Sequence, residues 1–140
     1  MIVPSPATVR QAGALVALEG VALVGMAVAE VVLYFRGSGS IAGFNGLGTA
    51  LWFAVMGSAV LAAAWALWTG RRWGRGLAVF AQLLLLPVAY YMAIGSGQWS
   101  LGVPVALVAV TTLVLLFSRS AIEWLSYDPA SADNSEPDTR

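Results

Sequence analysis

Two long stretches of the chain, residues 37–70 and 76–118, contain no Asp, Glu, Lys or Arg. About 20 apolar helical residues are enough to cross the hydrocarbon core of a bilayer, which is about 30 Å thick. Charged residues make up 10% of the chain, against roughly 25% in an ordinary soluble domain. So few polar groups could not cover a surface that faces water. The sequence therefore predicts a membrane protein.

Four hydrophobic segments, separated by turn residues, predict an all-α fold: an antiparallel bundle of four transmembrane helices. We expect the spans at residues 11–35, 47–68, 77–94 and 101–117. The first apolar segment is longer than that of a signal peptide, so we interpret it as a retained helix. Residues 37–48 are rich in Gly and Ser and predict a loop. Residues 95–100 predict a tight turn, which makes the last two spans a helical hairpin.

Proline, an amphipathic segment and an acidic tail complete the predicted organisation. Pro87 is expected to kink the third helix, and Pro104 is tolerated in the first turn of the fourth. Residues 120–127 are short and amphipathic, and we expect them to extend the fourth helix into the membrane interface or to lie on it. A domain over residues 11–127 thus follows a short cytoplasmic N-terminus, residues 1–10. Residues 128–140 are polar and acidic, which predicts a disordered tail.

The arginines are distributed unevenly between the two sides of the predicted bundle. Five flank one side, and Arg36 stands alone on the other. Over short loops, an excess of basic residues marks the cytoplasmic side. We therefore predict that both termini and the middle loop are cytoplasmic, in a multi-pass protein of the cell membrane. The five are Arg10, Arg71, Arg72, Arg75 and Arg119.

The tryptophans lie near the predicted span ends, where their amphipathic rings favour the membrane interface. Trp52 and Trp99 are expected in an outer aromatic belt. The tryptophans expected in the inner belt are Trp65, Trp68, Trp73 and Trp124.

Several kinds of chemistry are missing from the sequence. There is no Cys and no His, which removes disulfides, thiol chemistry, the usual zinc sites and imidazole catalysis. No nucleotide fingerprint or nucleophile–base pair is present. The net charge is zero, which suggests no nucleic-acid partner. We expect a protein that is not an enzyme and has no cofactor and no metal. An enzyme acting on lipids is disfavoured, because only isolated Ser, Tyr and Glu residues are available.

Two carboxyl groups, Glu19 and Glu30, lie within the first span. They are eleven residues apart, which puts them on one stripe of a helix, about 16 Å apart along its axis. Ionisable groups in a membrane helix normally face the bundle interior, so this stripe is predicted to face the other helices. Counting from the arginine flanks puts Glu19 at the depth of three further polar residues. This candidate inner polar site consists of Glu19, Gln82, Thr111 and Thr112.

Glu19 has two interpretations. It is either a protonatable site of a transporter or proton relay, or a structural group that holds helices together by hydrogen bonding to Gln82 or a threonine. The structural interpretation is the one we favour. A candidate outer polar cluster is formed by Glu30, Tyr90 and Tyr91, for which the structural role is favoured more strongly because the interface is near.

Small residues recur every four positions in the first two spans. The second span has Ala50, Ala54, Ser58, Ala62 and Ala66, and the first has Gly25 and Ala29. Small side chains at this spacing allow helix backbones to approach closely. Packing within the chain is favoured, and a dimerisation face is the alternative.

Between residues 70 and 118 the chain resembles a group of small integral membrane proteins that are common in actinobacteria. The shared elements are the loop GRRWGRG at 70–76, Gln82 followed by a Leu run and Pro87, LGVP at 101–104 and LLFS at 115–118. An early Glu in the first helix, here Glu19, also fits. The resemblance spans about residues 11–121 and implies only an integral membrane protein of unknown role.

The architecture is also similar to that of the small multidrug resistance transporters, which have four short helices and a membrane-embedded Glu in the first. Glu19 would be the matching residue, but this chain is longer and has a second Glu, Pro87 and an acidic tail. Our leading expectation is an accessory or scaffolding membrane subunit. The alternative is a proton-coupled small multidrug-type transporter that uses Glu19. The expected partners are the lipid bilayer and either other membrane proteins or a second copy.

Overall fold

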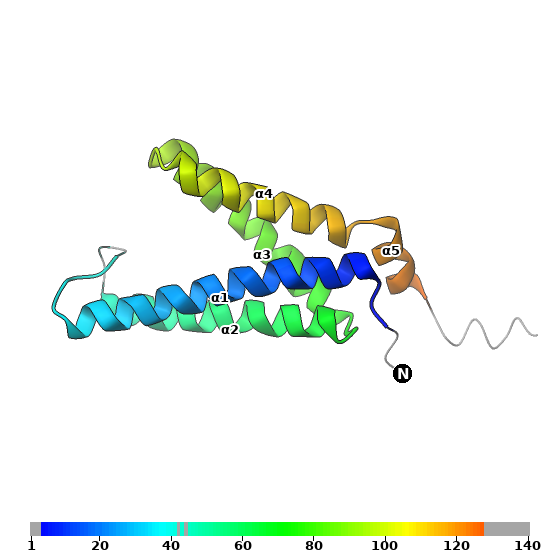
Figure 1. Ribbon diagram of the computed structural model, residues 1–140, viewed down its shortest axis with the longest axis horizontal. Coiled ribbons are helices and arrows are strands. Elements are labelled where there is room, and N and C mark those ends of the chain that lie inside the picture. The colour runs from blue at the N-terminus through cyan, green and yellow to red at the C-terminus, as the bar shows by residue number, and fades with distance from the viewer. Residues whose placement is uncertain (1–3, 42, 44, 128–140) are drawn as a thin grey trace, which may run out of the picture.

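A computed structural model describes residues 4–41, 43 and 45–127, so the predicted disordered tail, residues 128–140, lies outside the described residues. In chain order the elements are α1 (Ala7–Phe35), α2 (Gly46–Trp68), α3 (Trp73–Tyr90), the π-helix η1 (Tyr91–Gly95), α4 (Trp99–Leu116) and α5 (Arg119–Ser126) (Figure 1). Within the described residues, four helical segments are long and apolar enough to cross a membrane, namely α1, α2, α3 with η1, and α4. The predicted all-α bundle of four spans is confirmed.

The connections between the helices follow from local chemistry. The side chain of Asn45 accepts hydrogen bonds from the backbone N–H groups of Leu47 and Gly48, at 3.2 and 3.3 Å. This N-cap starts α2 at Gly46, inside the stretch predicted as loop. The tight turn between η1 and α4 contains Gly97 at φ +69°, a left-handed conformation that side chains with a Cβ rarely adopt. The predicted helical hairpin of the last two spans is therefore present.

The third span contains Pro87 and ends in a π-helix. Helix α3 runs through Pro87 to Tyr90 and then widens into η1. There the backbone N–H of Ser96 donates to the carbonyl of Tyr91, five residues back, at 2.9 Å. Because Pro87 has no N–H, the carbonyl left without its usual intrahelical donor is that of Leu83, four residues earlier, which lies outside η1.

Helices α1 and α2 pack closely because glycine lies where their backbones meet. A Cβ built at Gly57 would lie 2.8 Å from Val24 Cγ2 and 3.2 Å from the carbonyl oxygen of Gly20. Buried small residues recur every seven positions on both helices, which keeps one seam facing the partner over the whole hairpin. These residues are Gly13, Gly20 and Ala27 on α1, and Ala50, Gly57 and Ala64 on α2.

The predicted four-residue repeat of small residues packs within the chain only in part: Ala50 and Ala66 are buried, but other members face outwards. Gly25, Ser58 and Ala62 are exposed, and a Cβ at Gly25 would meet nothing within 4 Å. Four residues turn a helix about 40° past one full turn, so a stripe in steps of four winds away from a nearly parallel neighbour. Seven residues fall only about 20° short of two turns.

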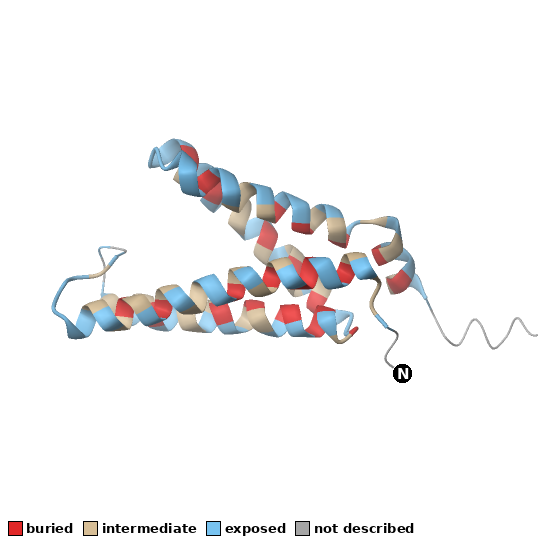
Figure 2. Ribbon diagram, viewed as in Figure 1, coloured by how far each residue is buried: buried red, intermediate tan, exposed pale blue. Residues whose placement is uncertain are grey.

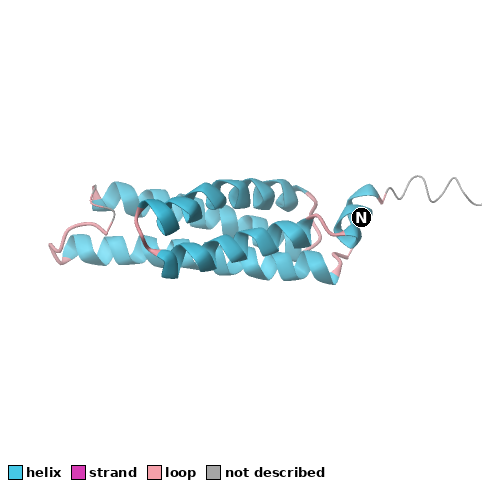
Figure 3. Ribbon diagram, turned by 90° about the horizontal axis from the view of Figure 1, so that it is seen from above, coloured by secondary structure: helices cyan, strands magenta, loops and turns pink. Residues whose placement is uncertain are grey.

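The two hairpins, α1–α2 and α3–α4, meet at one end and diverge at the other (Figure 1). They meet at the Arg-rich end, which carries Arg10, Arg71, Arg72, Arg75 and Arg119, and Figure 2 shows buried residues gathered on several helices there. Seen from above, the four long helices run along one common direction (Figure 3). The core at the Arg-rich end consists of Val9, Ala12, Val16, Val60, Ala63, Ala64, Leu67, Ala78, Leu116, Ala121 and Trp124.

Arginines hold the ends of helices together at the Arg-rich end. Arg75 Nε donates to the carbonyl of Leu116 at 3.1 Å, and Arg72 donates to the carbonyl of Tyr127. Both carbonyls lie at the C-terminal ends of helices, α4 and α5, where intrahelical partners run out. Further guanidinium groups lie over rings: Arg10 over Trp68 and Arg71 over Trp65, at 5.1 and 4.7 Å from the ring centroids.

The segment after Arg119 forms a separate helix. Helix α4 ends at Leu116, and α5 turns back against the bundle, where Thr8 and Ser120 share a hydrogen bond of 2.8 Å. The prediction that Trp124 belongs to an aromatic belt was wrong, because this ring is 5% exposed and packs in the core. The apolar face of α5 carries the ring inward.

We expect Gly57→Ala to lower the free energy of unfolding by about 1–3 kcal/mol, because the added methyl group has no room between α1 and α2. The thermal unfolding midpoint of the protein in detergent measures this loss. Gly25→Ala is the matched control and should not lower stability, and it can raise the free energy of unfolding by up to about 1 kcal/mol, because alanine is the better helix former. Equal effects of the two substitutions would contradict the seven-residue seam.

Candidate functional site

The inner polar site is built around a hydrogen bond between the two hairpins. Gln82 on α3 donates through Nε2 to Oε2 of Glu19 on α1, at 2.6 Å. Gln82 is completely buried, whereas Glu19 is partly exposed. The carboxyl group therefore points towards the bundle and not wholly into lipid. This contact joins α1 to α3, which belong to different hairpins.

Thr112 on α4 lies at the same depth as this pair. Gly102 fixes the register of α4 against α3, because a Cβ there would lie 2.7 Å from the carbonyl oxygen of Ala89 and 2.8 Å from the Cβ of Ala93. Thr112 is ten residues further along α4. Helix α3 runs antiparallel to α4. The residue of α3 at the level of Thr112 therefore lies about ten residues before Ala89 and Ala93, which is near Gln82.

Burial puts Thr112 on the inner face of α4. It belongs to a buried stripe with Gly102, Ala109 and Leu116, and it is completely buried. Its neighbour Thr111 is exposed. Of the predicted inner residues, the structure thus brings Glu19, Gln82 and Thr112 to one level, and Thr111 faces outwards.

Three buried oxygens of this inner polar site have no hydrogen-bond partner among the residues that the structure describes. They are Glu19 Oε1, Gln82 Oε1 and Thr112 Oγ1. A buried polar group without a partner costs about 1–3 kcal/mol, so such groups are rare and call for an explanation. Here three of them lie at one depth, on three different helices.

The hydroxyl of Thr112 makes no hydrogen bond to its own helix among the described residues, in contrast to Ser58 within α2 and to Thr69 and Ser96 just beyond the ends of α2 and η1. Ser58, Thr69 and Ser96 each donate to a backbone carbonyl four residues back, at 2.7 to 2.8 Å. This is the common way for a membrane helix to satisfy a hydroxyl group. Thr112 Oγ1 makes no such bond within the described chain. Its lone pairs and its proton are therefore available to a neighbour.

The outer polar residues lie apart from one another. Glu30 is completely buried, and a Cβ built at Gly46, the first residue of α2, would lie 3.7 Å from its Oε2. Tyr90 and Tyr91 are 65% and 67% exposed. They belong to α3 and η1, at the end where the hairpins diverge (Figure 1). The structure does not bring these tyrosines to Glu30, which packs instead against the start of α2.

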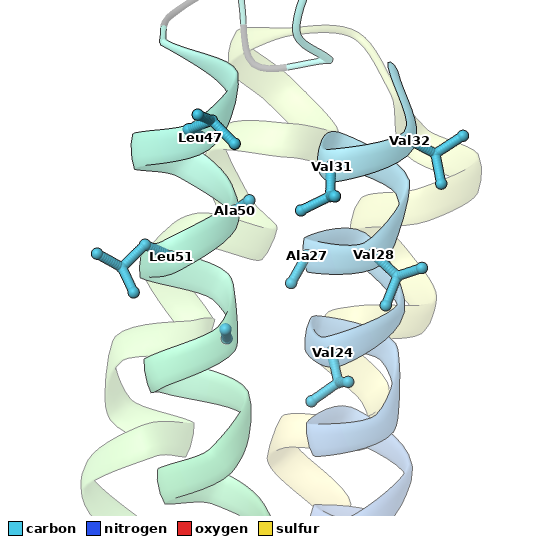
Figure 4. Close-up of a pocket in the computed structure, with 9 residues that line it drawn as sticks. Val24, Ala27, Val28, Val31, Val32, Leu47, Ala50 and Leu51 are labelled. Carbon is cyan, nitrogen blue, oxygen red and sulfur yellow. The ribbon is translucent and has the colours of Figure 1, made fainter. Parts of the chain in front are cut away.

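An apolar groove runs between α1 and α2 towards the end opposite the Arg-rich end. It has a volume of about 470 Å³, and only aliphatic side chains line it. In Figure 4, Ala27 and Ala50 lie between the two helices, while Leu51 and Val32 extend at the edges. Small residues at the floor and larger ones at the rims give a surface into which a further helix can pack. The lining consists of Val24, Ala27, Val28, Val31, Val32, Leu47, Ala50, Leu51 and Ala54.

The sequence interpretation did not identify this groove. A signal for it was present, since Ala27 and Ala50 belong to the seven-residue repeat of small residues and are flanked by Val and Leu. Finding the groove required the pairing of α1 with α2, because its two walls are more than ten residues apart along the chain.

We expect Gln82→Leu to lower the free energy of unfolding by about 2 kcal/mol, because it leaves Glu19 Oε2 without its donor. The double substitution Glu19→Leu and Gln82→Leu should lose less than the sum of the two single changes, since it removes both partners. Unfolding midpoints of the four proteins measure this coupling. Gln98→Leu, at an exposed Gln, is the control and should have little effect. Additive losses would contradict a stabilising Glu19–Gln82 bond.

The comparisons with known proteins add no relative to this geometry: no protein-family model, curated protein or solved structure matches the chain.

Proposed function

We propose that the chain is a non-enzymatic accessory or scaffolding subunit of the cell membrane, which binds other membrane proteins through its lateral apolar faces. The apolar groove between α1 and α2 is the observation that carries this proposal. Its Ala floor and its Val and Leu rims match the small-residue interfaces by which membrane helices associate. Association in lipid depends on such close packing, because apolar side chains gain little by leaving a solvent that is itself apolar.

The divergence of the hairpins supports the same role. Away from the Arg-rich end the two hairpins separate (Figure 1), and each has exposed apolar side chains there. Leu51, Val55 and Val28 are more than half exposed there, as are Val88 and Ile94 on the other hairpin. A second membrane protein could bury these apolar surfaces. Without such a partner, only lipid contacts them.

The test compares the tagged protein with two variants after extraction of native membranes in a mild detergent. Ala54→Leu places a larger side chain in the groove, whereas Ala14→Leu makes the same change at an exposed position near the Arg-rich end. We expect a stable partner to co-purify with the unaltered protein and with Ala14→Leu, and to be lost with Ala54→Leu. Partner binding that is insensitive to Ala54→Leu would contradict the groove as the interface.

A second candidate function is proton-coupled export of small cationic compounds by a dimer of this chain, with Glu19 as the protonatable group. The hydrogen bond from Gln82 favours it, because it leaves Glu19 Oε1 unpaired in the bundle. In that case the purified protein, alone in liposomes, moves substrate or protons. Glu19→Gln then abolishes transport while expression is kept. The same preparation decides between the two candidates, since an accessory subunit moves nothing by itself.

Orientation is the third part of the proposal, and the arginine asymmetry supports it. We propose that the Arg-rich end and both termini are cytoplasmic. The chain has no Cys, so single substitutions report cleanly on topology. With a maleimide that cannot cross membranes, Ser38→Cys should react in intact cells, and Tyr127→Cys should react only after the membrane is opened. The reverse pattern would invert the orientation.

A further inference from the structure

We propose that Glu19 Oε1, Gln82 Oε1 and Thr112 Oγ1 bind one Na⁺ ion between α1, α3 and α4. These are the three buried oxygens of the inner polar site that lack hydrogen-bond partners within the described residues. Both Gln82 and Thr112 are completely buried, Gln82 on α3 and Thr112 on α4, and the register that Gly102 sets between these helices puts them at one level. The inference does not depend on lateral association with a partner.

Charge determines the valence of the ion. When ionised, Glu19 brings one negative charge at this depth, and residues 37–70 and 76–118 contain no basic side chain to balance it. A bare carboxylate is costly inside a membrane. One monovalent cation makes the site neutral, whereas a divalent ion would leave a net positive charge. Divalent ions also favour several carboxylates, and the described residues hold no group of three or more His, Cys, Asp or Glu.

The donor atoms suit a hard cation. A carboxylate, an amide carbonyl and a hydroxyl group each supply oxygen, which small hard cations prefer over nitrogen or sulfur. The amide nitrogen of Gln82 is already used in the bond to Glu19 Oε2, and this fixes the amide so that its oxygen is the free atom. The hydroxyl of Thr112 is not used by the carbonyls of its own helix.

Thr112 distinguishes Na⁺ from a proton at the same place. A proton on Glu19 Oε1 could be donated to Gln82 Oε1, which would close an acid–amide pair and satisfy both atoms. Thr112 Oγ1 would still be left over. A cation held between the three helices would use all three oxygens, including Thr112 Oγ1, which has no other partner among the described residues.

The experiment measures thermal unfolding of the full chain in detergent, through its tryptophan fluorescence. NaCl is titrated against choline chloride at constant ionic strength and constant pH. A ligand that binds only the folded protein raises the unfolding midpoint in proportion to the logarithm of its concentration once that exceeds the dissociation constant. We expect this rise with NaCl and none with choline chloride.

Variants locate the effect at the inner polar site. Glu19→Gln should abolish the rise of the unfolding midpoint with NaCl. Thr112→Val removes one ligand, so the same rise should need Na⁺ concentrations at least about tenfold higher. Thr112→Ser keeps the hydroxyl and should respond as the unaltered protein does. Thr111→Val makes the same change at the exposed neighbour and should have no effect on the response. If Glu19→Gln fails to fold, binding of radioactive Na⁺ to the Thr112→Val and Thr112→Ser pair gives the same comparison.

Three results would overturn the proposal. The first is equal stabilisation by choline chloride, which indicates a general salt effect. The second is an unchanged Na⁺ response in Thr112→Val. The third is stabilisation by acid without any response to Na⁺, which assigns the site to a proton alone. None of these results bears on partner binding at the groove between α1 and α2, so the two proposals fail separately.

Discussion

Lipid offers no hydrogen bonds, and the rest of this structure depends on that constraint. Backbone groups meet it by forming helices, and side chains within the spans must find partners on other helices. Glu19 satisfies this constraint by accepting a hydrogen bond from Gln82. The bond joins the two hairpins, which otherwise diverge along much of their length. A single polar contact at this depth therefore links α1 to α3 where apolar packing becomes sparse.

Packing between the hairpins is uneven, and the reason is the distribution of small and large side chains. In the α1–α2 hairpin, Gly20 and Gly57 allow the backbones to touch through the middle of the membrane. Between the hairpins, close packing is concentrated at the Arg-rich end, where Gly74 lies so near α2 that a Cβ would come 2.6 Å from the Cβ of Ala66. Arg75 and Arg72 add bonds to helix ends there. The open side of the molecule is a consequence of this one-ended closure.

Much of the fold could be predicted from local sequence, whereas the inner polar site could be predicted only in part. Charge-free segments of membrane length specify four helices, and depth counting put Glu19, Gln82 and Thr112 in one layer. Depth counting could not tell Thr112 from Thr111, because adjacent residues on a helix differ by about 100° in direction but only about 1.5 Å in depth. The rotation of α4 about its axis makes that choice, and the contact of Gly102 with α3 sets the rotation.

The same limit explains the outer residues and Trp124. Glu30, Tyr90 and Tyr91 are similar in depth, but the divergence of the hairpins separates them, and no local pattern encodes that divergence. Trp124 has the composition of an interfacial ring, yet the chain reversal at Ser118 turns it into the core. The sequence by itself determined that the helices lie in lipid, how many spans there are and how the arginines are distributed between the two ends. These properties depend only on the hydrophobicity and charge of short segments. Only the tertiary structure decided which polar atoms meet, because that depends on the rotation and tilt of helices that are far apart in the chain.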